Sequence, residues 1–147
     1  MKKFFKIMLP LVLMGTLAIF PIQNSNATQP EADEEAEAIA PLLRSYGYDV
    51  HPYYSRGMLN RGQSTTLSRT FYAGNEYALV VGGCSYTRDI DIYVYDKYWN
   101  LIASDKGAKK HGVVSFDVYQ TGTFHIKIKM YDATSDGVHW AMLYAYK

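Results

Sequence analysis

The fold class of this chain is decided by the stretch Asp89-Ile90-Asp91-Ile92-Tyr93-Val94-Tyr95, in which aliphatic and polar residues alternate strictly. Because side chains along a β-strand point to opposite faces in turn, the three aliphatic residues must share one face and the others the opposite face. Aliphatic side chains face a core. The stretch therefore predicts a strand with one buried face and one outer face, and the outer face carries Asp89, Asp91, Tyr93 and Tyr95.

The same period of two continues on both sides of this strand, with turn residues between the runs. This pattern is typical of β-sandwiches and barrels. Each sheet has one apolar face that needs a partner, so we expect an all-β, antiparallel β-sandwich of seven to eight strands. In the last run either face could be buried. The predicted strands are Thr65–Tyr72, Glu76–Gly82, Asp89–Tyr95, Leu101–Ser104, Val113–Tyr119, Thr123–Tyr131 and Val138–Tyr146.

Composition limits the functions open to the chain. Its 147 residues suit one domain, and 48% hydrophobic against 20% charged residues argue for a folded chain. A single cysteine, Cys84, excludes a disulfide framework within the chain and a zinc site built on several thiolates. A net charge of +1 gives no electrostatic reason to expect nucleic acid as a partner.

The N-terminal segment has the organisation of a secretory signal peptide. Three lysines precede an apolar run over residues 7–20, and Ser25-Asn26-Ala27 offers a small-x-small cleavage site. We therefore expect residues 1–27 to be a signal peptide and the protein to be secreted or periplasmic. The less favoured alternative is an uncleaved membrane anchor, because the apolar run is short for a spanning helix and is interrupted by Pro10. After cleavage no membrane insertion is expected.

Residues 28–62 are expected to form an acidic arm and a connecting segment ahead of the β-sandwich domain, residues 63–147. The acids between Glu31 and Glu37 repel one another, so this part of the arm is predicted to be solvated, either disordered or a fraying helix. One or two helical turns are expected over residues 41–47. Residues 48–63 show no clear periodicity.

A family resemblance rests on the strand 89–96 and on the run Asn100–Asp105 that follows it. Together with Phe71–Tyr77 and Thr121–Ile126, these residues resemble the bacterial pre-peptidase C-terminal domain. The resemblance implies a jelly-roll-like β-sandwich that is usually attached to secreted peptidases as an accessory or substrate-binding module, in some members with calcium. This sequence departs from that arrangement, because no peptidase accompanies the domain.

Acidic residues of the outer face suggest a cation site. Asp89 and Asp91 stand two residues apart on one face, so their Cα atoms are about 7 Å apart. With further oxygens from Asp105, a loop carbonyl or the acidic arm, they could bind calcium, which prefers oxygen ligands. The alternative is an exposed strand with solubilising acids.

Aromatic residues of the same face suggest a binding surface. Tyrosine and tryptophan rings give a large contact area at low entropic cost, so they suit a protein or polysaccharide ligand. The alternative is that cross-strand tyrosine pairs only stabilise an exposed sheet. The predicted ligand-binding residues are Tyr93, Tyr95, Tyr98, Trp99 and Tyr119.

Catalysis finds little support in the sequence. Ser115, Asp117 and His125 could be drawn as a triad, but an exposed sheet face offers no pocket, and the Gly-x-Ser-x-Gly elbow is missing. Cys84 is expected to be a buried thiol, with a reactive or intermolecular thiol as the alternative. We therefore predict an exported, non-catalytic binding module. The alternative is a periplasmic inhibitor or chaperone of a secreted peptidase or other hydrolase.

Overall fold

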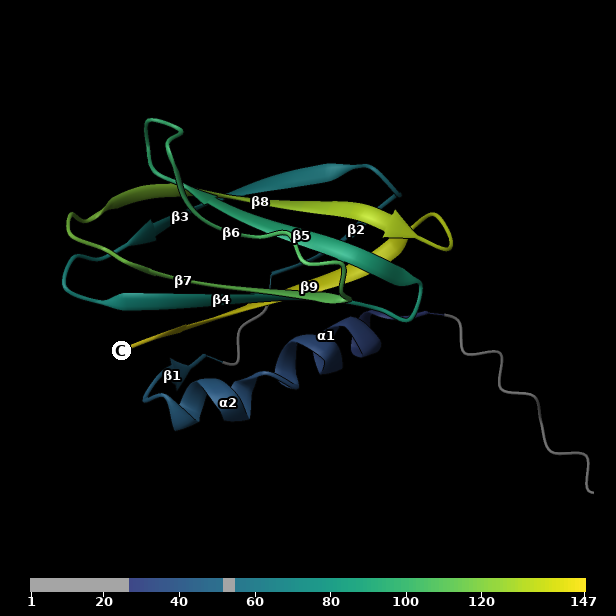
Figure 1. Cartoon of the computed structure of the whole chain (residues 1–147), viewed down its shortest axis with the longest axis horizontal. Helices are drawn as coiled ribbons and strands as arrows, with labels where there is room; N and C mark the ends of the chain where they lie inside the picture. The colour runs from purple at the N-terminus through teal and green to yellow at the C-terminus, as the bar shows by residue number, and fades with distance from the viewer. Residues whose placement is uncertain (1–26, 52–54) are drawn as a thin grey trace, which may run out of the picture.

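Two antiparallel sheets stacked face to face form the body of the protein (Figure 1). The computed structural model describes residues 27–51 and 55–147, so the predicted signal peptide lies outside the described residues except for Ala27. The elements are α1 (Gln29–Glu37), α2 (Ala40–Ser45), β1 (Asp49–Val50), β2 (Ser55–Leu59), β3 (Ser64–Phe71), β4 (Glu76–Gly83), β5 (Thr87–Tyr95), β6 (Leu101–Asp105), β7 (His111–Asp117), β8 (Gly122–Ala133) and β9 (Val138–Tyr146). Neither helix is long and apolar enough to cross a membrane.

The strand order confirms the predicted antiparallel sandwich. Sheet A has the order β1-β9-β4-β7, and β2 pairs with the same edge of β9 as β1. Sheet B has the order β3-β8-β5-β6. All seven predicted strands are present with ends shifted by at most two residues. The two additional strands, β1 and β2, come from the connecting segment in which the sequence shows no periodicity.

The core between the sheets is built from alternating aliphatic residues. Ile90, Ile92 and Val94 of β5 are completely buried, as their spacing predicts. They belong to the same buried cluster as Leu79 and Val114 of sheet A. Full burial of each such side chain contributes about 1.5–3 kcal/mol relative to exposure, so this cluster is a main source of stability.

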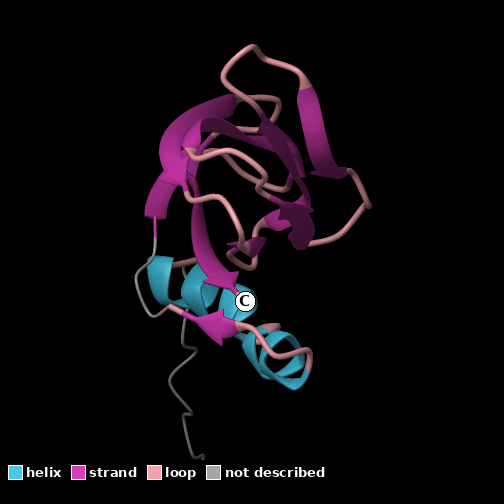
Figure 2. Cartoon of the chain, turned by 90° about the vertical axis from the view of Figure 1, so that its left-hand side faces the viewer, coloured by secondary structure: helices cyan, strands magenta, loops and turns pink. Residues whose placement is uncertain are grey.

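Sheet A is buried on both faces. In the last predicted strand, where either face could have been the buried one, both are. One face of β9 carries Trp140 and Met142 into the core between the sheets, and the other carries Leu143 and Ala145 into a second cluster. The two helices cover this second face (Figures 1 and 2). The second cluster contains Ala36, Leu43, Tyr48, Ala78, Val80, Leu143 and Ala145.

The acidic arm is helical, which is one of the two predicted forms, but it is a packed layer, so the expectation that it is solvated was wrong. Helix α1 turns Ala32 and Ala36 onto sheet A, and both are fully buried. Residues four apart share one helix face, and their small side chains let the backbone of α1 approach the sheet closely. Gly82 of β4 lies directly beneath, where a Cβ atom would meet the backbone of both alanines.

Three of the five acids of α1 bind groups of the sandwich. Asp33 pairs with Arg56 of β2 at 2.8 Å, and Glu35 contacts His111 of β7 at 2.9 Å. Glu31 accepts a hydrogen bond from the Ser85 backbone at 3.1 Å, and this bond is the main cause that lowers the pKa of its carboxyl. These three acids thus tie α1 to β2, to β7 and to the turn between β4 and β5.

We predict that Gly82→Ala destabilises the protein by lifting α1 from sheet A. Overpacking of a close contact costs about 1–3 kcal/mol, and the free energy of unfolding in urea measures it. The matched control is Gly122→Ala, because nothing lies within 4 Å of a Cβ atom at that position. Equal stability of the two variants would show that α1 does not pack on Gly82.

Candidate functional site

The outer face of sheet B is the one outer sheet face that no described element covers. Both helices lie on the side of sheet A, and sheet B turns its outer face away from them (Figures 1 and 2). The aliphatic residues of β5 point into the core, so Tyr93 and Tyr95 stand on this outer face, where both are partly exposed. The predicted binding residues of β5 are therefore accessible.

Four rings form a continuous row on this face, which we call the aromatic ladder: Tyr93, Tyr95, Trp99 and His125. The ring centres of Tyr93 and Tyr95 are 6.4 Å apart, and those of Tyr95 and Trp99 are 5.6 Å apart. Trp99 stacks on His125 at 4.2 Å with nearly parallel planes. The ladder thus joins β5, the β5–β6 turn and β8 into one surface.

A strained turn holds Trp99 in its place. Trp99 has a φ angle of 65°, a left-handed conformation that is rare for a bulky residue. The carboxylate of Asp96 stabilises this turn by accepting hydrogen bonds from the backbone of Tyr98 at 2.8 Å and of Asn100 at 2.9 Å. It also accepts one from the Asn100 amide, the main cause that lowers the pKa of Asp96.

Charged groups border the ladder. The Lys127 ammonium lies 5.9 Å from the centre of the Tyr93 ring, and the Tyr93 hydroxyl donates to Asp91 at 2.9 Å. Burial and this hydrogen bond raise the pKa of Tyr93 to about 12, so the phenol stays neutral and keeps its donor. His125 is held by a 3.0 Å hydrogen bond between its Nδ1 and the Ser68 hydroxyl.

Two of the five predicted ring residues lie apart from the ladder. Tyr98 and Tyr119 are 73% and 85% exposed, and both line a shallow hollow at one end of the sandwich, next to Phe124. No residue of the ladder lines this hollow. The structure therefore brings together Tyr93, Tyr95 and Trp99, and it places Tyr98 and Tyr119 in a different group.

Asp89 and Asp91 of β5 are more buried than residues on a fully exposed strand face. Asp91 is only 4% exposed, and one carboxylate oxygen of Asp89 and one of Asp91 are buried without a hydrogen-bond partner among the described residues. Burial raises the pKa of Asp89, and the charges of Asp91, Asp132 and Asp105 raise it further. A cation at this place would relieve both effects.

The third predicted calcium ligand is engaged elsewhere. The Asp105 carboxylate accepts hydrogen bonds from the backbone of Gly107 and of Val113, each at 3.0 Å. Over residues 27–51 and 55–147, no three His, Cys, Asp or Glu side chains come close enough together to hold a metal ion. Asp89 and Asp91 are thus the two side chains of the predicted set that could hold a cation.

The residues considered for catalysis are not brought together. Ser115 and Asp117 lie on β7 of sheet A, whereas His125 lies on the outer face of sheet B. The Ser115 hydroxyl faces the side of sheet A that carries the helices, because its neighbours Val114 and Phe116 point into the core. Cys84 is a buried free thiol.

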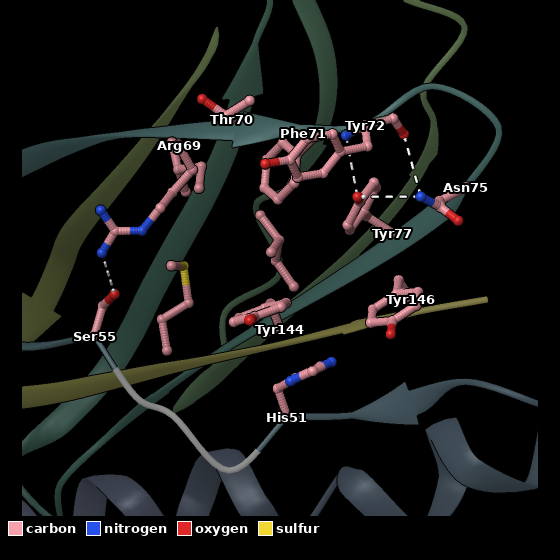
Figure 3. A pocket seen from close by; sticks show the side chains of 13 residues that line it. His51, Ser55, Arg69, Thr70, Phe71, Tyr72, Asn75, Tyr77, Tyr144 and Tyr146 are labelled. Carbon is pink, nitrogen blue, oxygen red and sulfur yellow. Dashed lines mark hydrogen bonds between the residues drawn. The ribbon is translucent and has the colours of Figure 1, made fainter. Parts of the chain in front are cut away.

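A cleft at the sandwich edge is a feature that sequence reasoning missed. It has a volume of about 540 Å³ and lies between β3 of sheet B and β9 of sheet A (Figure 3). On one wall the His51 ring stacks on Tyr144 at 4.8 Å and on Tyr146 at 5.1 Å. Its lining comes from segments far apart in the sequence, so no local motif could reveal it.

Comparison with known proteins supports the fold. No family model matches the sequence, and no curated protein matches it significantly. Among solved structures, a periplasmic inhibitor of g-type lysozyme from Aeromonas hydrophila is 14% identical with a TM-score of 0.51, over 67% of this chain and 88% of that chain. The pre-peptidase C-terminal domain of a collagenase from Bacillus anthracis is 15% identical with a TM-score of 0.49, over 65% and 88%. At such identities a likeness concerns the fold alone.

We predict that Asp96→Ala releases Trp99 from the ladder. The carboxylate favours the turn when ionised, so its contribution is present above the unfolded-state pKa of about 3.9 and is lost as the pH falls through the lower folded-state pKa. At neutral pH, acrylamide should quench the tryptophan fluorescence of the variant more strongly than that of the wild type. The wild type should reach the stronger quenching only in acid. Asp136→Ala, in a different exposed turn, is the control; equal quenching in all three proteins would contradict this role of Asp96.

Proposed function

We propose that this protein is an exported, non-catalytic binding module that recognises an extracellular or periplasmic macromolecule, a protein or a polysaccharide, through the aromatic ladder. The observation that carries this proposal is the position of four contacting rings on the one outer sheet face left uncovered by the described elements. Rings in such a position are available to a ligand without any rearrangement of the fold.

The ladder has the properties of a preorganised contact surface. Trp99 is 56% exposed yet fixed by the turn of Asp96 and by stacking on His125, so little side-chain freedom is lost when a ligand binds. A left-handed tryptophan costs conformational energy, and strain of this kind gathers at functional positions. The surface is a row on a sheet, which suits an extended chain or a protein surface better than a small molecule.

An inhibitor or chaperone of a secreted hydrolase is the alternative function. The Aeromonas hydrophila protein of similar fold is described as an inhibitor of g-type lysozyme. The same sheet face would then contact an enzyme, and the ligand would be one protein held in a stoichiometric complex.

We also propose that a calcium ion binds to Asp89 and Asp91 beside the ladder. The support is chemical: both carboxylates have a buried oxygen without a partner among the described residues, and two acids in one place repel each other. Calcium accepts carboxylate and water oxygens in flexible geometry, so two protein carboxylates could hold it with water completing the shell.

The calcium proposal predicts opposite effects of Asp89→Asn with and without the ion. The folded-state pKa of Asp89 is raised, so its contribution to stability is lost as the pH rises through that pKa, and the neutral variant should melt higher at pH 7 in chelator. Calcium should raise the melting temperature of the wild type and leave that of Asp89→Asn unchanged. Asp136→Asn serves as the control. The same calcium response in all three proteins would refute the site.

The binding proposal predicts that ligand affinity depends on Tyr95 and Trp99. A ligand would first be sought among immobilised polysaccharides and in secreted extract, with and without chelator. Tyr95→Ala and Trp99→Ala should each weaken its binding about tenfold or more, because aromatic anchors at interfaces are commonly worth 2 kcal/mol or more, roughly 30-fold. Tyr119→Ala, equally aromatic but outside the ladder, should bind as the wild type does.

The outcomes separate the two functions. A polysaccharide bound through Trp99, or a non-enzyme protein so bound, supports the module. A secreted hydrolase that is captured through Trp99 and loses activity in the complex supports the inhibitor. A ligand whose affinity is unchanged by both ladder variants would overturn the proposed binding face.

A further inference from the structure

The two long edges of the sandwich differ. On one edge β6 and β7 are joined across the sheets, because the Asp105 carboxylate of β6 accepts a hydrogen bond from the Val113 backbone of β7 at 3.0 Å. On the other edge a side-chain hydrogen bond from Arg69 of β3 to Ser55 of β2 spans the opening, and the cleft of about 540 Å³ lies between β3 and the β2–β9 pair (Figure 3). This volume is within the usual range for a ligand pocket.

The walls of the cleft are mostly aromatic and aliphatic. Phe71 and Tyr77 form its inner end with ring centres 4.5 Å apart, and Tyr144 and Tyr146 form the opposite wall. Phe71 and Tyr77 are buried core residues, and the Tyr77 hydroxyl accepts a hydrogen bond from the Tyr72 backbone at 3.1 Å. These rings are fixed in position, so the cleft is preformed.

The rim of the cleft carries the guanidinium of Arg69. Arg69 shares the inward face of β3 with Leu67 and Phe71, and its guanidinium reaches across the opening to donate to the Ser55 hydroxyl at 3.0 Å. No carboxylate of the described residues lies within ion-pair distance of Arg69, and no Asp or Glu is found among the described lining residues. The guanidinium of Arg69 could therefore pair with an anionic group of a ligand.

The backbone of β3 is open along the same edge. Within the described ranges β3 pairs only with β8. The Gln63 carbonyl accepts a hydrogen bond from the Met130 N–H, so Gln63 and every second residue after it turn their backbone groups toward β8. The residues between them, Thr66, Ser68 and Thr70, therefore direct their N–H and C=O groups away from β8. The Ser68 carbonyl indeed accepts a hydrogen bond from Arg69 at 3.2 Å.

We propose that an extended peptide segment of a partner protein binds as an added strand along β3, with a large apolar side chain in the cleft and a carboxylate on Arg69. Strand addition uses the free backbone groups for affinity and pockets between alternate side chains for specificity. An Arg–carboxylate pair adds a charge-assisted, bidentate contact. This site shares no residue with the aromatic ladder, so either proposal can fail without the other.

A peptide satisfies all three features of the edge at once. A polysaccharide could stack in the cleft but has no regular row of N–H and C=O groups to match β3. Pairing of β3 with β3 of a second copy is disfavoured, because β3 carries Arg69 and no acidic residue to pair with it. Peptide binding therefore accounts together for the open backbone, the apolar cleft and a guanidinium that has no carboxylate partner among the described residues.

The first test uses blocked pentapeptides in which Phe and Glu stand two positions apart between threonines, in both orders. Titrated into the purified, isotope-labelled protein, they should shift the amide signals of Thr66, Ser68 and Thr70. Peptides with Lys in place of Glu, or Ser in place of Phe, should each bind about tenfold more weakly. The Lys peptide loses the charge-assisted pair with Arg69, and the Ser peptide loses the apolar contact in the cleft. Arg69→Glu should reverse the order and prefer the Lys peptide.

A second test addresses the backbone. Thr70→Pro removes the N–H group that faces the open edge and keeps the pairing with β8, whereas the β-branched control Thr70→Val keeps the N–H group. Only the proline variant should lose peptide binding, and unchanged thermal unfolding would verify that both variants fold. The proposal is overturned if neither peptide order shifts the β3 amides, if Arg69→Glu leaves the Glu preference intact, or if the edge is found closed by a second copy.

Discussion

Burial of sheet A on both faces is the constraint on which the rest of this structure depends. β4 and β9 are apolar on both sides, so a two-layer sandwich would leave Val80, Leu143 and Ala145 in water. Helices α1 and α2 prevent this, and the contact of Ala32 and Ala36 with Gly82 brings α1 close enough to exclude solvent. The molecule is thus a helical layer on a sandwich, and its outer surface is correspondingly asymmetric.

This asymmetry determines which surfaces of the described structure are accessible, and both proposed sites lie on them. The helices occupy one outer face, and the β6–β7 contact through Asp105 closes one edge. The described residues leave uncovered the outer face of sheet B and the edge at β3. Both open regions carry chemistry that a purely structural surface does not need. On the face, Trp99 is held in a left-handed conformation against His125, and at the edge Arg69 lies above an aromatic cleft without an acidic partner among the described residues.

Much of the fold was readable from local pattern because β5, β7 and β8 alternate with a period of two, and the burial of Ile90, Ile92 and Val94 followed directly. The helix α1 was misjudged because acids dominate its composition, and the one signal of packing was the pair Ala32 and Ala36, four residues apart. The ladder was only partly readable. Tyr93 and Tyr95 share a strand, but the separation of Tyr98 from Trp99 depends on a backbone angle, and the cleft depends on strand order.

Native-state hydrogen exchange of α1 tests the account most directly, because a third layer and a solvated arm differ most there. If α1 is an integral layer, the amides of Ala36 and Glu37 should exchange only through opening events nearly as costly as those that expose the central strands β4 and β9. Exchange of these amides at the rate of an unstructured chain, with β4 and β9 still protected, would contradict the account and would leave sheet A with a second open face.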